Sequence, residues 1–104
     1  MEGRIIHKVH DDILSRAVTA FVWGDPPRSW PSSDPAAVTR LFGDGGAELV
    51  QRITALLAEL DQVPPDDDLV VYGDRIEQAL ESNHPELTKP AREALARRYT
   101  FGWR

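Results

Sequence analysis

Proline and glycine divide this chain of 104 residues into short segments, and their positions limit what it can fold into. Pro26-Pro27, Pro64-Pro65 and Pro85 interrupt regular backbone hydrogen bonding, and residues 43–46 (GDGG) break any regular element. Between these breaks, apolar residues recur mostly every three or four positions, which is the period of an amphipathic helix. The sequence therefore predicts several short helices joined by turns.

The first predicted helix covers residues 5–23 and is followed by a stiff, proline-rich connection over residues 24–35. The apolar face of this helix is expected to comprise Ile6, Val9, Ile13, Ala17 and Phe21, with Leu14 and Val18 widening the stripe. Asp34 is the predicted N-cap of the second helix, because an acceptor side chain followed by proline is a strong helix start. This helix is expected to end at Leu41 or Phe42, where the glycines begin.

The third predicted helix has a wide apolar stripe and ends before Pro64. Its stripe comprises Leu49, Val50, Ile53, Leu56, Leu57 and Leu60. Asp66 or Asp67 is expected to cap a fourth helix that continues to about Ser82, although residues 69–72 (LVVY) alone would suit a strand.

Thr88 is the predicted N-cap of a fifth helix, in which Pro90 still falls within the first turn. We therefore expect an all-α fold, a compact bundle of about five short helices that forms a single helical domain over residues 1–104.

Charge is unevenly distributed along the chain, whose net charge is −5. Residues 44–87 contain eleven acidic residues and two basic ones. Because phosphate binding needs clustered lysine and arginine, we do not expect direct nucleic-acid binding. The N-terminus lacks the apolar core of a secretory signal and no apolar run is long enough to span a membrane, so we expect a cytoplasmic protein. The absence of cysteine excludes disulfides and thiolate metal sites.

An acidic stripe on the fourth helix is the strongest candidate binding feature. Asp67, Asp74, Glu77 and Glu81 fall on one side of the predicted helix, largely opposite its apolar face. Such a stripe can simply keep a protein soluble, or it can steer a basic partner. We predict partner binding by these four carboxylates, with Trp30 of the proline-rich connection as a possible aromatic anchor.

His7, His10 and Asp11 share one face of the first predicted helix, a spacing that can present two imidazoles and a carboxylate to one metal ion. No second pair of histidines or cysteines accompanies them, so a solvated helix face is the favoured interpretation. We predict no cofactor, no metal and no catalytic residues. A small metal-dependent enzyme using these three residues is the alternative.

The C-terminal helix has an apolar arc about twice as wide as the ~100° stripe of a surface helix. Such a helix is either wedged between others or has one face left for a partner. Tyr99, Phe101 and Trp103 are expected to be core residues, with Phe101 or Trp103 as alternative binding anchors. Arg98 falls inside the arc, so we expect a carboxylate from the acidic middle of the chain beside it, or a helix end that turns it outward.

Residues 84–104 (HPELTKPAREALARRYTFGWR) resemble the ends of short bacterial proteins that confer immunity to secreted toxins. The resemblance is carried by the HPEL turn, Thr88, the EALA segment (Glu93–Ala96), and Tyr99-Thr100-Phe101 with Trp103 before a basic residue. It implies a small protein that binds and neutralises a toxin domain, often a basic nuclease. We therefore predict a non-enzymatic, protein-binding inhibitor that is a monomer or homodimer; a structural homo-oligomer subunit is a further alternative.

Overall fold

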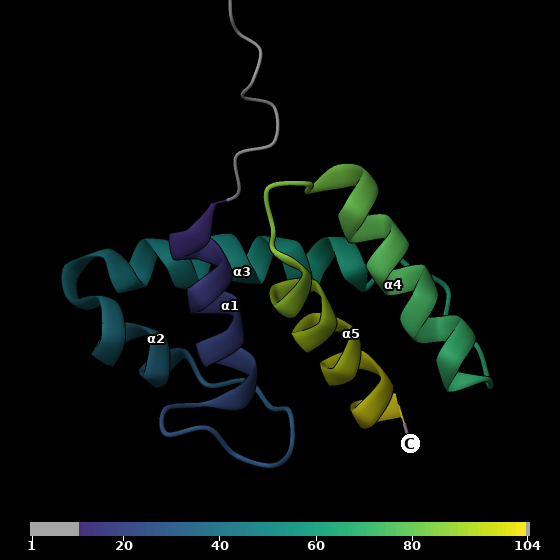
Figure 1. The fold of residues 1–104 in the computed structure, drawn as a ribbon, viewed down its shortest axis with the longest axis horizontal. Coiled ribbons are helices and arrows are strands. Elements are labelled where there is room, and N and C mark those ends of the chain that lie inside the picture. The colour runs from purple at the N-terminus through teal and green to yellow at the C-terminus, as the bar shows by residue number, and fades with distance from the viewer. Residues whose placement is uncertain (1–10, 104) are drawn as a thin grey trace, which may run out of the picture.

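The computed structural model describes residues 11–103, with side chains through Phe101, and their regular structure is helical. The elements are α1 (Asp12–Trp23), α2 (Pro35–Phe42), a 3₁₀ turn η2 (Gly43–Gly45), α3 (Gly46–Leu60), α4 (Leu69–Asn83) and α5 (Lys89–Trp103). α5 lies between α1 and α4, and α3 crosses behind them, with α2 at one end (Figure 1). Residues 11–103 contain no strand, which confirms the predicted compact, all-α fold.

The first helix begins later than the sequence suggested. Asp11 is extended (φ −88°, ψ 91°), and its carboxylate accepts a hydrogen bond from the Leu14 amide at 3.0 Å. Asp11 is therefore the N-cap of α1, and a capping residue does not continue a helix through itself. The prediction of a helix running from residue 5 through residue 11 is wrong at this point. Residues 5–10, with Ile6 and Val9, lie outside the described part of the chain.

Within the described residues, the buried face of α1 matches the predicted stripe except at Ile13. Leu14, Ala17, Val18 and Phe21 are buried, at the spacing of a single helix face, whereas the predicted core residue Ile13 is 57% exposed. Ile13 therefore lies on the solvent side of the stripe that begins at Leu14.

The proline-rich connection is fixed against α1 by hydrogen bonds. The amides of Ser32 and Asp34 donate to carbonyls of the last turns of α1, at 2.7 and 2.8 Å. Arg28 pairs with Asp34 at 3.2 Å, and this guanidinium, together with the Ala37 amide, lowers the pKa of the Asp34 carboxyl. The same carboxylate caps α2 through Ala37, so the predicted start of this helix is confirmed.

The corner between α2 and α3 is closely packed. Residues 43–46 form the predicted helix-to-helix turn, with a short 3₁₀ segment. Gly46 is buried, and a Cβ atom there would lie only 2.8 Å from Cα of Thr39. Only glycine therefore lets the two helix backbones approach this closely.

The N-cap of α4 is Asp68, not Asp66 or Asp67 as predicted. The Asp68 side chain accepts from the amides of Val70 and Val71, whereas the Asp66 carboxylate accepts from the Asp68 amide and pairs with Arg75 at 3.3 Å. Asp66 thus shapes the turn that precedes the helix. Residues 69–72 are helical, so the strand that they alone would suit does not form.

α5 is wedged between α1 and α4, which explains its wide apolar arc. Ala91 and Leu95 are fully buried, and the Tyr99 hydroxyl donates to the Leu57 carbonyl of α3 at 2.8 Å and contacts Asp61 at 2.7 Å. Burial and the bond to Asp61 raise the pKa of the Tyr99 phenol.

Two expectations for the C-terminal helix are corrected. Of the two alternatives for Arg98, a carboxylate partner or an outward turn, the carboxylate is not found among the described residues: the Nε of Arg98 donates to the Ser33 hydroxyl at 2.9 Å and its guanidinium lies 5.3 Å from the centre of the Tyr99 ring. Phe101 is 45% exposed, so it is not a core residue. The side chain of Trp103 lies outside the described side chains.

Candidate functional site

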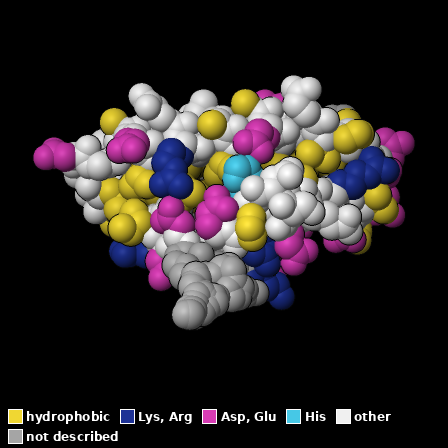
Figure 2. Space-filling model, turned by 90° about the horizontal axis from the view of Figure 1, so that it is seen from above, with side chains coloured by type: hydrophobic (Ala, Val, Ile, Leu, Met, Phe, Trp, Pro, Cys, Tyr) yellow, Lys and Arg dark blue, Asp and Glu magenta, His cyan; other side chains and the backbone are white. Residues whose placement is uncertain are grey.

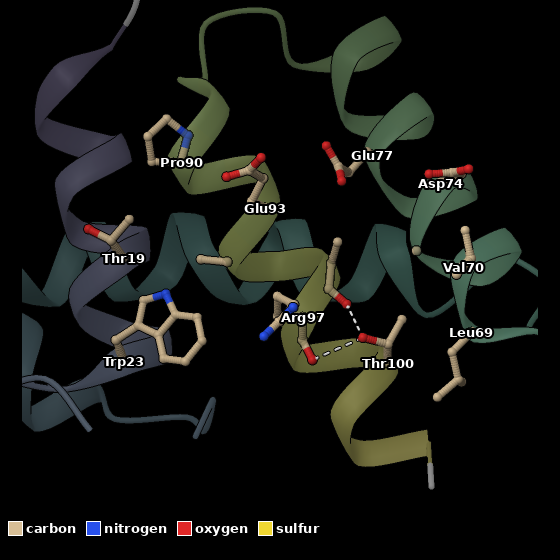
Figure 3. A pocket seen from close by; sticks show the side chains of 13 residues that line it. Thr19, Trp23, Leu69, Val70, Asp74, Glu77, Pro90, Glu93, Arg97 and Thr100 are labelled. Atoms are coloured by element: carbon tan, nitrogen blue, oxygen red, sulfur yellow. Dashed lines mark hydrogen bonds between the residues drawn. The ribbon is translucent and has the colours of Figure 1, made fainter. Parts of the chain in front are cut away.

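A groove lies along α5, between α1 and α4, with a volume of about 800 Å³ (Figure 3). We call it the α5 groove. Its lining residues are Thr19 and Trp23 of α1; Leu69, Val70, Gly73, Asp74 and Glu77 of α4; and Pro90, Glu93, Ala94, Ala96, Arg97 and Thr100 of α5. One helix thus forms the floor and two others form the walls.

The α4 wall carries acidic side chains next to exposed apolar surface. Asp74 is exposed and Glu77 is half-buried, and neither side chain makes an ion pair with the described residues. Val70, one turn before Asp74, is 73% exposed. An exposed valine beside unpaired carboxylates is a surface that a partner with apolar and basic side chains would cover.

A smaller hollow, of about 310 Å³, continues the acidic wall toward the C-terminal end of α4. Asp74, Glu77 and Glu81 line it from α4, and Lys89 and Arg92 face them from α5. Arg92 donates to the Leu87 carbonyl at 2.8 Å and Lys89 lies 3.9 Å from Glu93, so both bases have partners on their own side of this hollow.

The structure brings together three of the five predicted binding residues. Asp74, Glu77 and Glu81 follow one another along α4, as their helical spacing predicted. Asp67 precedes the N-cap of α4 and does not line the α5 groove. The prediction that Asp67 belongs to the helical stripe is therefore wrong. Trp30 is 52% exposed in the proline-rich connection, and it does not line the groove either.

The proline-rich connection nevertheless borders the groove. Ser29 and Pro31, on either side of Trp30, line a hollow of about 350 Å³ together with Phe101. This hollow shares Leu69, Arg97 and Thr100 with the α5 groove, so the two are continuous.

Sequence reasoning found only Asp74 and Glu77 among the groove residues, and four of those it missed are Trp23, Val70, Gly73 and Arg97. Two of them had a usable signal. Gly73 is a glycine in the interior of a predicted helix, which is unfavourable unless the position has a packing or functional reason. Val70 is an apolar residue off the predicted buried face. Trp23 and Arg97 had none, because only tertiary packing places them on one groove.

Thr100 packs against α4 at the floor of the groove. Its hydroxyl donates to the carbonyls of Ala96 and Arg97, at 3.1 and 3.3 Å, within α5 (Figure 3). Its methyl group is therefore free to face α4, and a Cβ atom on Gly73 would lie 3.5 Å from it. That is an ordinary van der Waals contact, so the packing of α4 on α5 does not itself require glycine here.

The candidate metal ligands are only partly described. His7 and His10 lie outside residues 11–103, whereas Asp11 uses one carboxylate oxygen to cap α1 and the other to pair with Arg52 at 3.1 Å. Among the described residues, no group of three or more histidine, aspartate or glutamate side chains is arranged to hold a metal ion.

His84, which the sequence placed only in a turn, links two parts of the fold. Its Nε2 lies 2.8 Å from Glu59 of α3, and its Nδ1 lies 3.3 Å from Glu86. Burial opposes the charged imidazolium, but the hydrogen bonds to the two carboxylates outweigh burial and raise the pKa of His84.

Acidic and basic side chains alternate with apolar ones on the face seen in Figure 2, so charge is not segregated there.

Comparison with known proteins returns no match, either to a family model or to a curated protein or solved structure. In the described residues, no helix has the length and apolar character needed to cross a membrane.

Proposed function

We propose that this protein is a protein-binding module of the inhibitor or immunity type, which binds and neutralises a basic partner such as a toxin or nuclease domain in the cytoplasm. The observation that carries this proposal is the row of acidic side chains on α4, along the α5 groove and the smaller hollow that continues it. Asp74, Glu77 and Glu81 lie together on α4 without ion pairs to the described residues, next to the exposed Val70. The C-terminal resemblance to immunity proteins agrees with this role.

The chemistry of such a site is recognition, not catalysis. Unpaired carboxylates around a groove raise the rate at which a positively charged partner associates and select against acidic ones. Apolar side chains at the centre of the groove then slow dissociation, because a departing partner must expose this buried apolar surface to water again. This division of roles makes the proposal testable by kinetics.

The test uses the protein encoded next to this one, provided that it is basic and of toxin size. Association is followed by stopped-flow at about 0.01 M and 0.15 M salt, between which the screening length falls from about 30 Å to about 8 Å. Wild-type association should slow markedly with salt. The Asp74→Lys/Glu77→Lys variant should associate about tenfold more slowly or worse at low salt, with a flatter salt dependence.

The matched control is Asp44→Lys/Glu48→Lys, which changes the net charge equally at two exposed positions that do not line the groove. Its effect on the association rate should be smaller. Equal slowing by the two double variants would mean that only the net charge matters. A partner whose association ignores salt would contradict the proposal.

A further inference from the structure

We infer that the α5 groove receives an amphipathic α-helix of the partner protein, with apolar side chains on the groove floor and basic side chains toward Asp74 and Glu77. This inference rests on the proposed function and states what form the docking segment takes. It is carried by the shape of the groove, by Gly73 and by the distribution of unpaired charge.

The floor of the groove follows one face of a single helix. Pro90, Glu93, Ala94, Arg97 and Thr100 line it at positions i, i+3, i+4, i+7 and i+10 of α5. At a rise of 1.5 Å per residue, this stripe is about 15 Å long, which is nearly three helical turns. A trough of this length between α1 and α4 matches a helix lying along α5, and the continuous hollow near Phe101 extends it.

Other peptide-binding modes fit this groove less well. Strand addition needs an exposed sheet edge, and residues 11–103 form no strand. Proline-rich peptides bind on several clustered aromatic rings, whereas Trp23 is the one aromatic residue among those that line the groove. A helix brings its own satisfied backbone, so it needs only apolar and charged side chains from the groove.

Gly73 gives independent support, because the fold alone does not account for it. A glycine in the middle of a helix is less favourable than alanine by about 1 kcal/mol. Alanine would fit at this position, since its Cβ atom would lie 3.5 Å from the Thr100 methyl group. The missing side chain instead deepens the groove wall where another helix would come closest to α4.

The charges of the groove give the docked helix a defined orientation. Asp74 and Glu77 lie on the α4 wall, whereas the Arg97 side chain points away from them, toward the side of Trp23 (Figure 3). Within the described residues, none of the three makes an ion pair. A helix with lysine or arginine on the flank facing α4 therefore meets complementary charge, and one with acidic residues on that flank is repelled.

The probe for this inference is a 15-residue helical peptide with leucine at i, i+3, i+4 and i+7 and lysine along one flank. A second peptide carries glutamate in place of each lysine. Both are titrated into ¹⁵N-labelled full-length protein, and amide chemical shifts and dissociation constants are recorded. The lysine peptide should shift the amides of Gly73, Ala94 and Thr100, and it should bind at least tenfold more tightly than the glutamate peptide.

Groove-filling variants provide the decisive comparison. Gly73→Leu should weaken binding of the lysine peptide at least tenfold and Gly73→Ala by less, whereas Ala58→Leu, at an exposed site outside the groove, should leave it within twofold. Circular dichroism and the melting temperature establish that each variant is folded. If Gly73→Leu is not folded, the comparison with wild type uses Gly73→Ala instead. Shifts centred on another face, or equal binding by folded Gly73 variants, would overturn the inference.

Three further outcomes also decide the matter. If the same amides shift with protein concentration when no peptide is present, a second copy of this chain occupies the groove, and the partner-helix inference is wrong. A basic protein partner that binds Gly73→Leu as well as wild type would refute the groove inference while leaving the proposed function standing. Conversely, binding of the lysine peptide in the groove without inhibition of any basic partner would refute the proposed function alone.

Discussion

Two helical glycines show how the closed and open sides of this molecule differ. Gly46, at the α2–α3 corner, is buried where a Cβ atom would lie 2.8 Å from the Thr39 backbone, so the fold requires it. Gly73, on the wall of the α5 groove, would accept a Cβ atom at 3.5 Å from a methyl group. The corner is determined by packing, whereas the groove retains a glycine that packing does not demand. Gly73 lowers helix propensity without a packing need, and this is the basis for assigning it a role in the groove.

The largest expected effect tests the core-facing side of α4, which lies beside its groove-facing side. Ile76 lies one turn after Gly73 but is fully buried in the core. Ile76→Ala should lower the free energy of unfolding by about 2–5 kcal/mol, through lost burial and the cavity left behind. Urea denaturation measures this loss. A loss below 1 kcal/mol would mean that α4 is loosely packed on both faces, and the contrast between them would disappear.

Gly46→Ala tests the closed side directly. The new methyl group would overlap the Thr39 backbone, so α2 and α3 must move apart. Overpacking of this kind typically costs about 1–3 kcal/mol, which exceeds the gain in helix propensity. Thermal unfolding followed by circular dichroism measures the change. A melting temperature at or above that of wild type would show that the corner can open freely.

A part of the fold away from the groove, around His84, predicts a pH dependence of stability. His84 is held between Glu59 and Glu86, with Arg52 lining the same hollow, and its pKa is raised in the folded state. The stabilising contribution of the imidazolium is therefore complete below the unfolded pKa of about 6.5 and is lost as pH rises through the folded-state pKa.

We expect unfolding free energy to fall across that window in wild type, and to fall less in His84→Gln. Urea titrations at closely spaced pH values measure both curves, and NMR titration of the ring gives the pKa. A stability that rises with pH over this window, or an unchanged fall in His84→Gln, would contradict the assignment.

The fold was largely predictable because its signals are local. Proline and glycine marked the helix ends, and Asp34 is the N-cap of α2, as predicted. The helical period of α4 outweighed the strand tendency of residues 69–72. Errors arose where neighbouring residues compete for one role. Asp66, Asp67 and Asp68 are all acceptors, and the choice depends on Arg75, seven residues downstream of Asp68, which pairs with Asp66.

The site was predictable only in part, because it depends on tertiary packing. Asp74, Glu77 and Glu81 share a wall through helix periodicity, and the sequence shows that directly. Trp23 and Arg97 line the same groove only because α5 is wedged between α1 and α4, and contacts over such sequence distances leave no local pattern. The acidic side chains of the α4 wall were therefore predicted, whereas Trp23 and Arg97 were missed.

The central claim is that Gly73 serves the groove and not the fold, and the free energy of unfolding of Gly73→Ala tests it without any partner. Alanine adds helix propensity and fits beside Thr100, so the variant should be more stable than wild type by about 0.5–1 kcal/mol. The same substitution at Gly46 should have the opposite sign, which makes it the matched control. If Gly73→Ala is instead less stable than wild type by 1 kcal/mol or more, the packing of α4 on α5 requires the glycine, and the claim is wrong.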